Sequence, residues 1–243
     1  DLLLDGTAIA GGGGTALELY AESYDGTSGL PVATGSTNAV AIGRAYASGA
    51  DSFAAAIANN TSSYGATGAN SVAIGRLAKA SGSNSVAIGN FTKAAGAQSV
   101  VVGYQSNDTS TGEGAAAFGR NADAGSPYSA ALGPESVTAG LNNYASALTR
   151  SYASGADSFA AAIANNTSSY GATGSNSLAI GKQNKATATI STAVGGQNCV
   201  ASHNYAFASG NGSTASGYAS TSIGHSNTAS EFYTVSTGGF ALA

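Results

Sequence analysis

NSVAIGRLAKASGSNSVAIG, residues 70–89, contains one six-residue phrase twice, at a distance of fourteen residues. A related segment, SVVVG, ends fourteen residues later at Gly103. Similar five-residue segments end at Gly43, Gly119, Gly133, Gly181, Gly195 and Gly224. A fixed period of this kind is the signature of a stacked repeat, so the sequence predicts an array of about fourteen short units.

Each segment alternates between two sets of side chains. Val72 and Ile74 lie on one side of the predicted strand, and Ser71 and Ala73 lie on the other. The residues after each segment carry a weaker alternation and a glycine-containing turn, so each unit supplies two short strands and two turns. The fold class predicted from this pattern is all-β, a parallel solenoid in which each strand pairs with its equivalents in neighbouring coils.

The larger apolar side chains of the repeat have no obvious place inside such a coil. Alanine is small enough to fill a narrow interior, which leaves Val and Ile as a long apolar row that needs another surface. We therefore predict self-association around an axis parallel to the rod. The residues assigned to the trimer or roll core are Val40, Ile42, Val72, Ile74, Val86, Ile88, Val100, Val102, Phe118, Leu132, Leu178, Ile180, Val194 and Ile223.

The chain also contains a long internal duplication. The sequence YASGADSFAAAIANNTSSYGATG occurs at residues 46–68 and again, letter for letter, at residues 152–174. The repeats are predicted to occupy residues 39–243, as two related blocks near 39–144 and 145–243. Residues 1–38 do not fit the repeat and are predicted to form an N-terminal cap or a junction.

The composition excludes several classes of function. Only 8% of the residues are charged, with 35 Gly and a net charge of −4, which is atypical of an enzyme domain. Eight dispersed basic residues against twelve acidic ones form no dense patch for nucleic acid. No apolar run is long enough to cross a bilayer, so we expect no direct membrane insertion by this fragment.

No motif for catalysis, a metal or a cofactor is present in the sequence. The two histidines lie near no nucleophile motif, and the single cysteine, Cys199, has no second thiol at metal-ligand spacing. The acidic N-terminal residues match no calcium loop and predict a solvated cap; they are Asp1, Asp5, Glu18, Glu22 and Asp25. We predict no catalytic residues, no bound metal and no cofactor.

All eight basic residues fall in register with the repeat. Arg44, Arg76, Arg120, Arg150 and Lys182 directly follow the strand-ending position, and Lys79, Lys93 and Lys185 lie four residues after it. One hypothesis is a basic ribbon that binds an anionic cell-surface glycan. The alternative is that charges occupy the only solvated side of the coil. Tyr64 and Tyr170, in the duplicated loops, could stack on a sugar or simply cover the backbone.

The repeated NSVAIG at residues 70–75 and 84–89, with its fourteen-residue period, resembles the head repeat of YadA-like trimeric autotransporter adhesins, which also occurs in bacteriophage tail fibres. The resemblance implies a left-handed parallel β-roll, a side-by-side homotrimer, an extracellular location and attachment to a cell-surface glycan or protein receptor. The closing residues SEFYTVSTGGFALA slightly favour a phage fibre over a bacterial adhesin. An ice-binding solenoid and an enzymatic solenoid are remote alternatives, because threonines share no register and charges are thinly spread.

Overall fold

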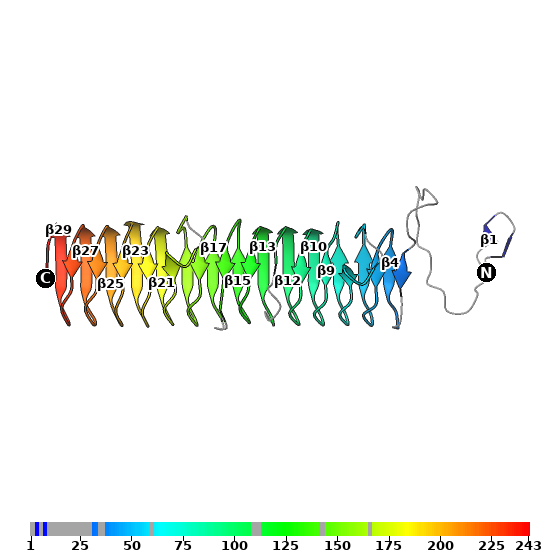
Figure 1. Cartoon of the computed structure of the whole chain (residues 1–243), viewed down its shortest axis with the longest axis horizontal. Helices are drawn as coiled ribbons and strands as arrows, with labels where there is room; N and C mark the ends of the chain where they lie inside the picture. Colours follow the sequence, from blue (N-terminus) through cyan, green and yellow to red (C-terminus); the bar gives the residue numbers. More distant parts are fainter. Residues whose placement is uncertain are drawn as a thin grey trace.

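The computed structural model of the chain describes residues 31–33, 37–58, 61–107, 113–140, 144–164 and 167–243, together with the backbone of residues 3–4 and 7–8. The described part is a rod of stacked coils, confirming an all-β parallel solenoid of about fourteen turns (Figure 1). It contains strands and turns and no helix, so no helix there could cross a membrane. Most of segment 1–38, including its acidic residues, lies outside the described residues.

The repeated phrase forms a fourteen-stranded parallel sheet, here called the long sheet. Adjacent coils pair in register, with Val72 opposite Val86 and Val86 opposite Val100. The strands are β4 (Val40–Ile42), β6 (Phe53–Ala55), β8 (Val72–Ile74), β10 (Val86–Asn90), β12 (Val100–Tyr104), β13 (Ala116–Arg120), β15 (Ala130–Leu132), β17 (Ser146–Leu148), β19 (Phe159–Ala161), β21 (Leu178–Lys182), β23 (Thr192–Gln197), β25 (Phe207–Asn211), β27 (Thr221–His225) and β29 (Val235–Gly239).

Two-residue strands form the opposite side of each coil, here called the short face. They make ladders of five and eight strands, joined by bridges from Asn107 to Lys93 and Asp123. The strands are β3 (Val32–Ala33), β5 (Tyr46–Ala47), β7 (Gly65–Ala66), β9 (Lys79–Ala80), β11 (Lys93–Ala94), β14 (Asp123–Ala124), β16 (Val137–Thr138), β18 (Tyr152–Ala153), β20 (Gly171–Ala172), β22 (Lys185–Ala186), β24 (Val200–Ala201), β26 (Thr214–Ala215) and β28 (Thr228–Ala229).

The short face extends into the segment that the sequence assigned to a cap or junction. Strand β3 pairs with β5, so Val32 and Ala33 belong to the ladder of the short face. Near the N-terminus, β1 (Leu3–Leu4) and β2 (Thr7–Ala8) form an antiparallel pair.

The interior of the rod is made mainly of alanine. Ala73 and Ala87 of the long sheet and Ala80 and Ala94 of the short face are fully buried. The two faces of each coil are close together, so small side chains fill most of the space, with Val101 at the equivalent position in one coil. The outward-pointing members of the repeat, such as Val72 and Ile74, are only half-buried.

Serine and glycine close the turns of each coil. The Ser85 hydroxyl donates a 2.7 Å hydrogen bond to the Gly82 carbonyl, three residues earlier, and Ser71 bonds Gly68 in the same way. Gly89 lies one residue before the end of β10, at φ 129°, and a Cβ atom there would lie 1.8 Å from the Gly103 carbonyl oxygen. The repeat therefore requires glycine at this strand end, because one coil closes directly against the backbone of the next.

Candidate receptor-binding surface

The strand registers place the eight basic residues in two columns along the rod. Lys79 pairs directly with Lys93 on β9 and β11, and Lys185 occupies the same column further along. This column, the lysine column, lies on the short face, and its three lysines are half-buried. The second column follows the ends of the long-sheet strands, and its basic members are all exposed; they are Arg44, Arg76, Arg120, Arg150 and Lys182.

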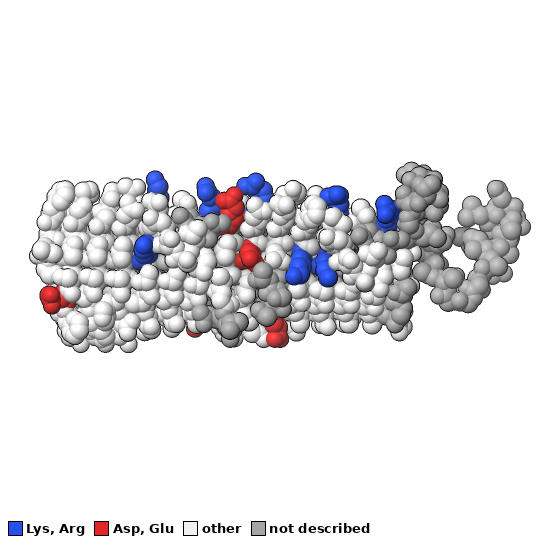
Figure 2. All heavy atoms as spheres, viewed as in Figure 1, with Lys and Arg blue, Asp and Glu red and all other residues white. Residues whose placement is uncertain are grey.

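The second column is interrupted by uncharged residues. Between Arg76 and Arg120, the ladder places Asn90 and Tyr104 at the same position. Figure 2 shows basic side chains separated along one long side of the rod, and it shows almost no charge at the C-terminal end of this face. The geometry therefore gives separate cationic points and one adjacent lysine pair, instead of a continuous ribbon.

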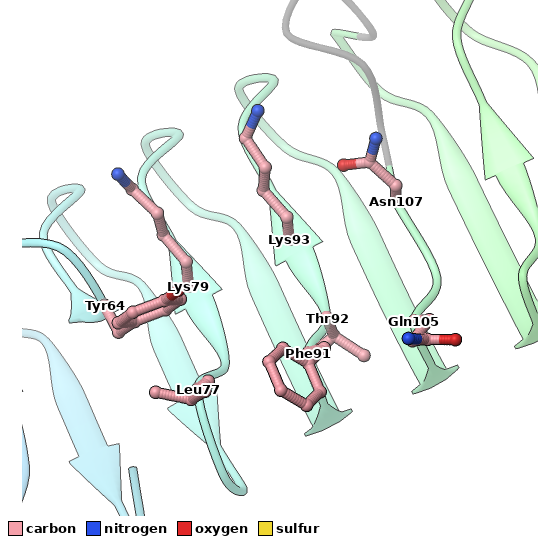
Figure 3. Close-up of a pocket in the computed structure, with 8 residues that line it drawn as sticks. All are labelled: Tyr64, Leu77, Lys79, Phe91, Thr92, Lys93, Gln105 and Asn107. Carbon is pink, nitrogen blue, oxygen red and sulfur yellow. The ribbon is translucent and has the colours of Figure 1, made fainter. Parts of the chain in front are cut away.

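The lysine pair borders a shallow cavity of about 310 Å³ (Figure 3). Lys79 and Lys93 extend in the same direction from neighbouring strands, with the Tyr64 ring beside Lys79 and the Phe91 ring below. The residues that line the cavity are Tyr64, Leu77, Lys79, Phe91, Thr92, Lys93, Gln105 and Asn107. Ammonium groups, an exposed amide and aromatic faces therefore surround one depression, a combination suited to an acidic sugar.

Phe91 is held by a cation from the second column. The Arg76 guanidinium carbon lies 5.1 Å from the centre of the Phe91 ring, within the range of a cation–π interaction. Phe91 itself is in the left-handed region, with φ 57°, and 39% of its surface is exposed. Arg76 therefore covers part of a ring that the backbone already projects outward.

Tyr64, Lys79 and Lys93 are predicted site residues, and the sequence also places Phe91 at a comparable outer position; Leu77, Thr92, Gln105 and Asn107 complete the cavity and were not predicted. Leu77, Phe91 and Gln105 are spaced by fourteen residues and share a left-handed conformation. The same period that located the lysines could have placed these three residues together, because equal positions in successive coils are neighbours.

The second duplicated loop builds only part of this arrangement. The Lys185 ammonium lies 5.0 Å from the centre of the Tyr170 ring, so the tyrosine and lysine of the first copy are retained. The coil after Lys185, however, places Val200 at the position of Lys93. The lysine pair is therefore confined to the first block.

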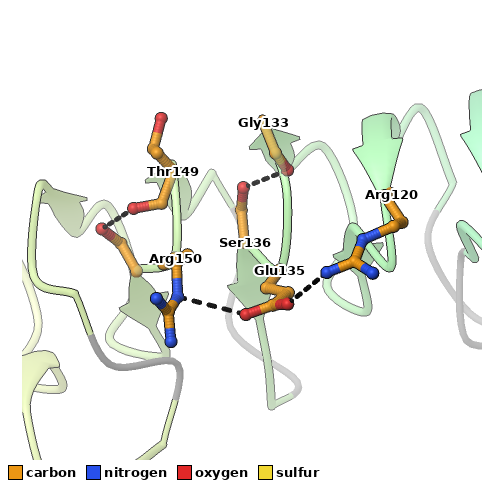
Figure 4. A network of polar contacts seen from close by, with 7 residues as sticks. Arg120, Gly133, Glu135, Ser136, Thr149 and Arg150 are labelled. Atoms are coloured by element: carbon orange, nitrogen blue, oxygen red, sulfur yellow. Dashed lines mark hydrogen bonds and ion pairs between the residues drawn. The ribbon is translucent and has the colours of Figure 1, made fainter.

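Two arginines of the second column share one carboxylate (Figure 4). Glu135 lies between Arg120 and Arg150 and accepts from both, at 2.8 Å and 3.1 Å. Both arginine side chains remain more than half exposed. Their positive charge is therefore partly cancelled, unlike that of Lys79 and Lys93, for which no ion pair occurs among the described residues.

Two side chains outside the cavity have a raised pKa. A hydrogen bond to Glu113 and the negative charge of that residue raise the pKa of Tyr128, whose ring also stacks on Tyr144. Burial raises the pKa of the Cys199 thiol, and hydrogen bonds from the surrounding backbone oppose the rise. Within the described part of the chain, no three His, Cys, Asp or Glu residues gather as a metal site.

The predicted apolar row lies on the outer side of the long sheet. None of its residues is fully buried in the chain, and Val40, Phe118 and Ile223 are 38%, 40% and 42% exposed. The row therefore does not form the interior of the roll, which is mainly alanine. It remains as a continuous apolar surface that is half open to solvent.

Comparison with protein-family models identifies the repeat. The YadA head domain repeat matches residues 66–92, 80–106, 110–136 and 172–198. The chain carries YadA head repeats. The first two matched segments overlap by about one coil. Together they contain Lys79, Phe91 and Lys93, so the lysine pair lies in coils that match the YadA head repeat. No curated protein matches the chain.

Proposed function

We propose that the chain is a non-enzymatic attachment module, displayed outside the cell as a side-by-side homotrimer of left-handed YadA head coils, which binds an anionic cell-surface glycan. The cavity between Lys79 and Lys93 carries the proposal. It is the place in the described residues where two adjacent ammonium groups, unopposed by a carboxylate, meet aromatic rings. A carboxylated sugar would place its acid between the lysines and its ring against Phe91 or Tyr64.

The outer face of the long sheet supports the trimer. Covering the exposed half of a Val or Ile side chain contributes about 1 kcal/mol, half of the value for full burial. All fourteen strands offer at least one partly exposed Val, Ile, Leu or Phe side chain, so the gross gain of about 14 kcal/mol per chain lies near the upper end of the cost of association, about 4–15 kcal/mol. A straight, repeating stripe matches an identical stripe on a parallel copy, which favours rotational symmetry about the rod axis.

Two biological settings fit this module. The YadA head match favours the head of a bacterial trimeric autotransporter adhesin that binds host matrix or cells. The other setting is a phage tail fibre that binds a bacterial surface, since the repeat of residues 70–89 resembles that of such fibres. Both settings use an extracellular trimeric rod for attachment, and neither requires a catalytic step or a cofactor.

The trimer is tested by absolute mass. Light scattering after size exclusion should give three times the 23.3 kDa mass of the chain, and the value should persist on dilution. A stable monomer would show that the apolar face needs no partner, and this would remove the trimeric part of the proposal.

Glycan binding is tested with polygalacturonate as the acidic probe, using isothermal titration calorimetry. Lys79→Gln with Lys93→Gln should weaken binding at least tenfold. The charge-matched control, Arg44→Gln with Lys182→Gln, should change it less than threefold, because only the first pair borders the cavity. Equal losses in both variants would indicate a general charge effect, and the absence of any binding would reject the acidic-glycan site.

A further inference from the structure

A group of aromatic side chains lies at one corner of the last coils, far from the lysine pair. The turn before each long-sheet strand contains a residue in the left-handed region. Asparagine occupies this position in several coils, such as Asn70 and Asn84, and tyrosine occupies it in others, at residues 128, 144, 205 and 233. Near the C-terminus Tyr205 and Tyr233 have φ 61° and 58°, and both contact a further ring from the coil between them.

The rings at this corner touch one another across three coils. Tyr218 lies at the centre, with ring centroids 5.4 Å from Tyr205, 5.9 Å from Phe232 and 5.7 Å from Tyr233. His203 packs against Tyr218 at 5.7 Å with its ring nearly perpendicular. These five residues are named the aromatic corner. Tyr205, Phe232 and Tyr233 remain 50%, 68% and 73% exposed.

The backbone conformation does not account for tyrosine at this corner. Asparagine and glycine adopt the left-handed region readily, whereas a bulky residue there is an outlier that costs on the order of 1 kcal/mol. The Tyr205 ring, which has coils on both sides, does not recover this energy by burial, because half of its surface faces solvent. The left-handed turn recurs in every coil, at Ile190 and Ala219 among others, so it belongs to the repeat; what distinguishes this corner is that its rings lie together and remain exposed.

The surroundings of the aromatic corner are nearly free of charge. After Lys185 the sequence has no lysine or arginine, and its only carboxylate side chain is Glu231. The tyrosine hydroxyls provide polar edges, and His203 adds a donor. Its Nδ1 accepts a 2.9 Å hydrogen bond from the backbone N–H of Asn204. The hydrogen on Nε2 is then available to another acceptor. Flat apolar faces with polar edges suit an uncharged pyranose, whose axial C–H groups lie against the ring while its hydroxyls reach the edge.

We infer that the aromatic corner is a second binding site, distinct from the lysine pair, for a neutral glycan of β-linked pyranose units. Its size favours a sugar over a protein partner. Three rings that expose half or more of their surface and two that expose less offer roughly 500 Å², below the ~800 Å² per partner that a stable protein interface buries. The ridge covers three coils, roughly 10–15 Å, which is the length of a short oligosaccharide.

The test uses cellohexaose and chitohexaose in isothermal titration calorimetry with the intact chain in its native assembly. At least one hexamer should bind, and Tyr205→Asn with Tyr233→Asn should weaken it at least tenfold. Because asparagine fits the left-handed position better than tyrosine, the same variant should keep or raise the Tm. A structural role for the rings predicts a lower Tm instead.

Two control variants distinguish the effect of removing these rings from a general effect of substitution on the fold. Tyr144→Asn changes the same corner position four coils away and should leave hexamer affinity unchanged, whereas Tyr205→Phe keeps the ring and should retain most of the binding. The inference is overturned if neither hexamer binds, if the double variant binds like the wild type, if its Tm falls, or if its mass in solution changes. The polygalacturonate titration reports on the lysine pair independently, so failure of one site does not imply failure of the other.

Discussion

Replacing Gly89 by alanine tests whether close stacking of coils holds the rod together. At φ 129°, residue 89 is in a region that L-amino acids rarely adopt, and the new Cβ would lie 1.8 Å from the Gly103 carbonyl oxygen. The backbone strain costs about 1–3 kcal/mol. The clash adds about 1–3 kcal/mol, as overpacking does in cores, because that carbonyl is part of the paired strand β12 and cannot move alone.

The expected loss is therefore about 2–6 kcal/mol, and a chain of this size should show a fall in Tm of roughly 5–20 °C. Circular dichroism during heating at a fixed scan rate measures it. Gly239→Ala is the matched control, since no atom lies within 4 Å of its added Cβ. If the two variants melt at the same temperature, close stacking does not limit stability. The explanation given for the glycine that recurs every fourteen residues would then be wrong.

Two further outcomes follow from polar groups outside the binding sites. Glu135→Gln removes the carboxylate between Arg120 and Arg150 but should lower stability by less than about 1 kcal/mol, because ion pairs with exposed arginines are weak; a loss of several kcal/mol in chemical denaturation would contradict this. Burial raises the pKa of Cys199 above that of the unfolded chain, so its contribution to stability is complete below about pH 9 and is lost as the pH rises further. The wild type should therefore lose Tm relative to Cys199→Ala in alkaline buffer, and parallel pH profiles would refute the argument.

The sequence was sufficient to predict the coil and its periodicity. The spacing of Gly75, Gly89 and Gly103 and the alternation of Val and Ala predicted a parallel solenoid, and the strand registers confirm it. The rule succeeds because each coil repeats one local solution: an alanine inside, a serine closing the turn and a glycine at the close contact. Long-range topology is then determined by the repeat itself.

Side-chain arrangements between coils were less predictable. Tyr64 and Tyr170 lie in identical loops, yet Lys185 covers Tyr170, while Figure 3 shows the Lys79 ammonium directed away from the Tyr64 ring. The neighbouring coil decides the difference, because Lys93 is present beside the first lysine and Val200 beside the second. Such pairs depend on which residues adjacent coils contribute, and repeat length alone does not specify them.

The aromatic corner could have been detected in the sequence from the spacing of its residues. Tyr218 and Phe232 are fourteen residues apart, and Tyr205 and Tyr233 are twenty-eight apart, so both pairs occupy equivalent corners. The mutual orientation of their rings could not be read from that spacing, since it depends on rotamers and on the left-handed backbone. Likewise, Glu135 meets both Arg120 and Arg150 through the ends of long side chains, whose positions the repeat spacing does not specify.

The in-register stacking of coils also affects how such a protein can change over generations. The identical segments at residues 46–68 and 152–174 occupy equivalent positions separated by seven steps of the lysine column ladder, a distance of about 34 Å along the rod. Genetic exchange between the two segments would add or delete whole coils and rejoin the chain in the same register. The reach of the rod could thus lengthen or shorten in one event, without a new core and without an altered seam where the pieces meet.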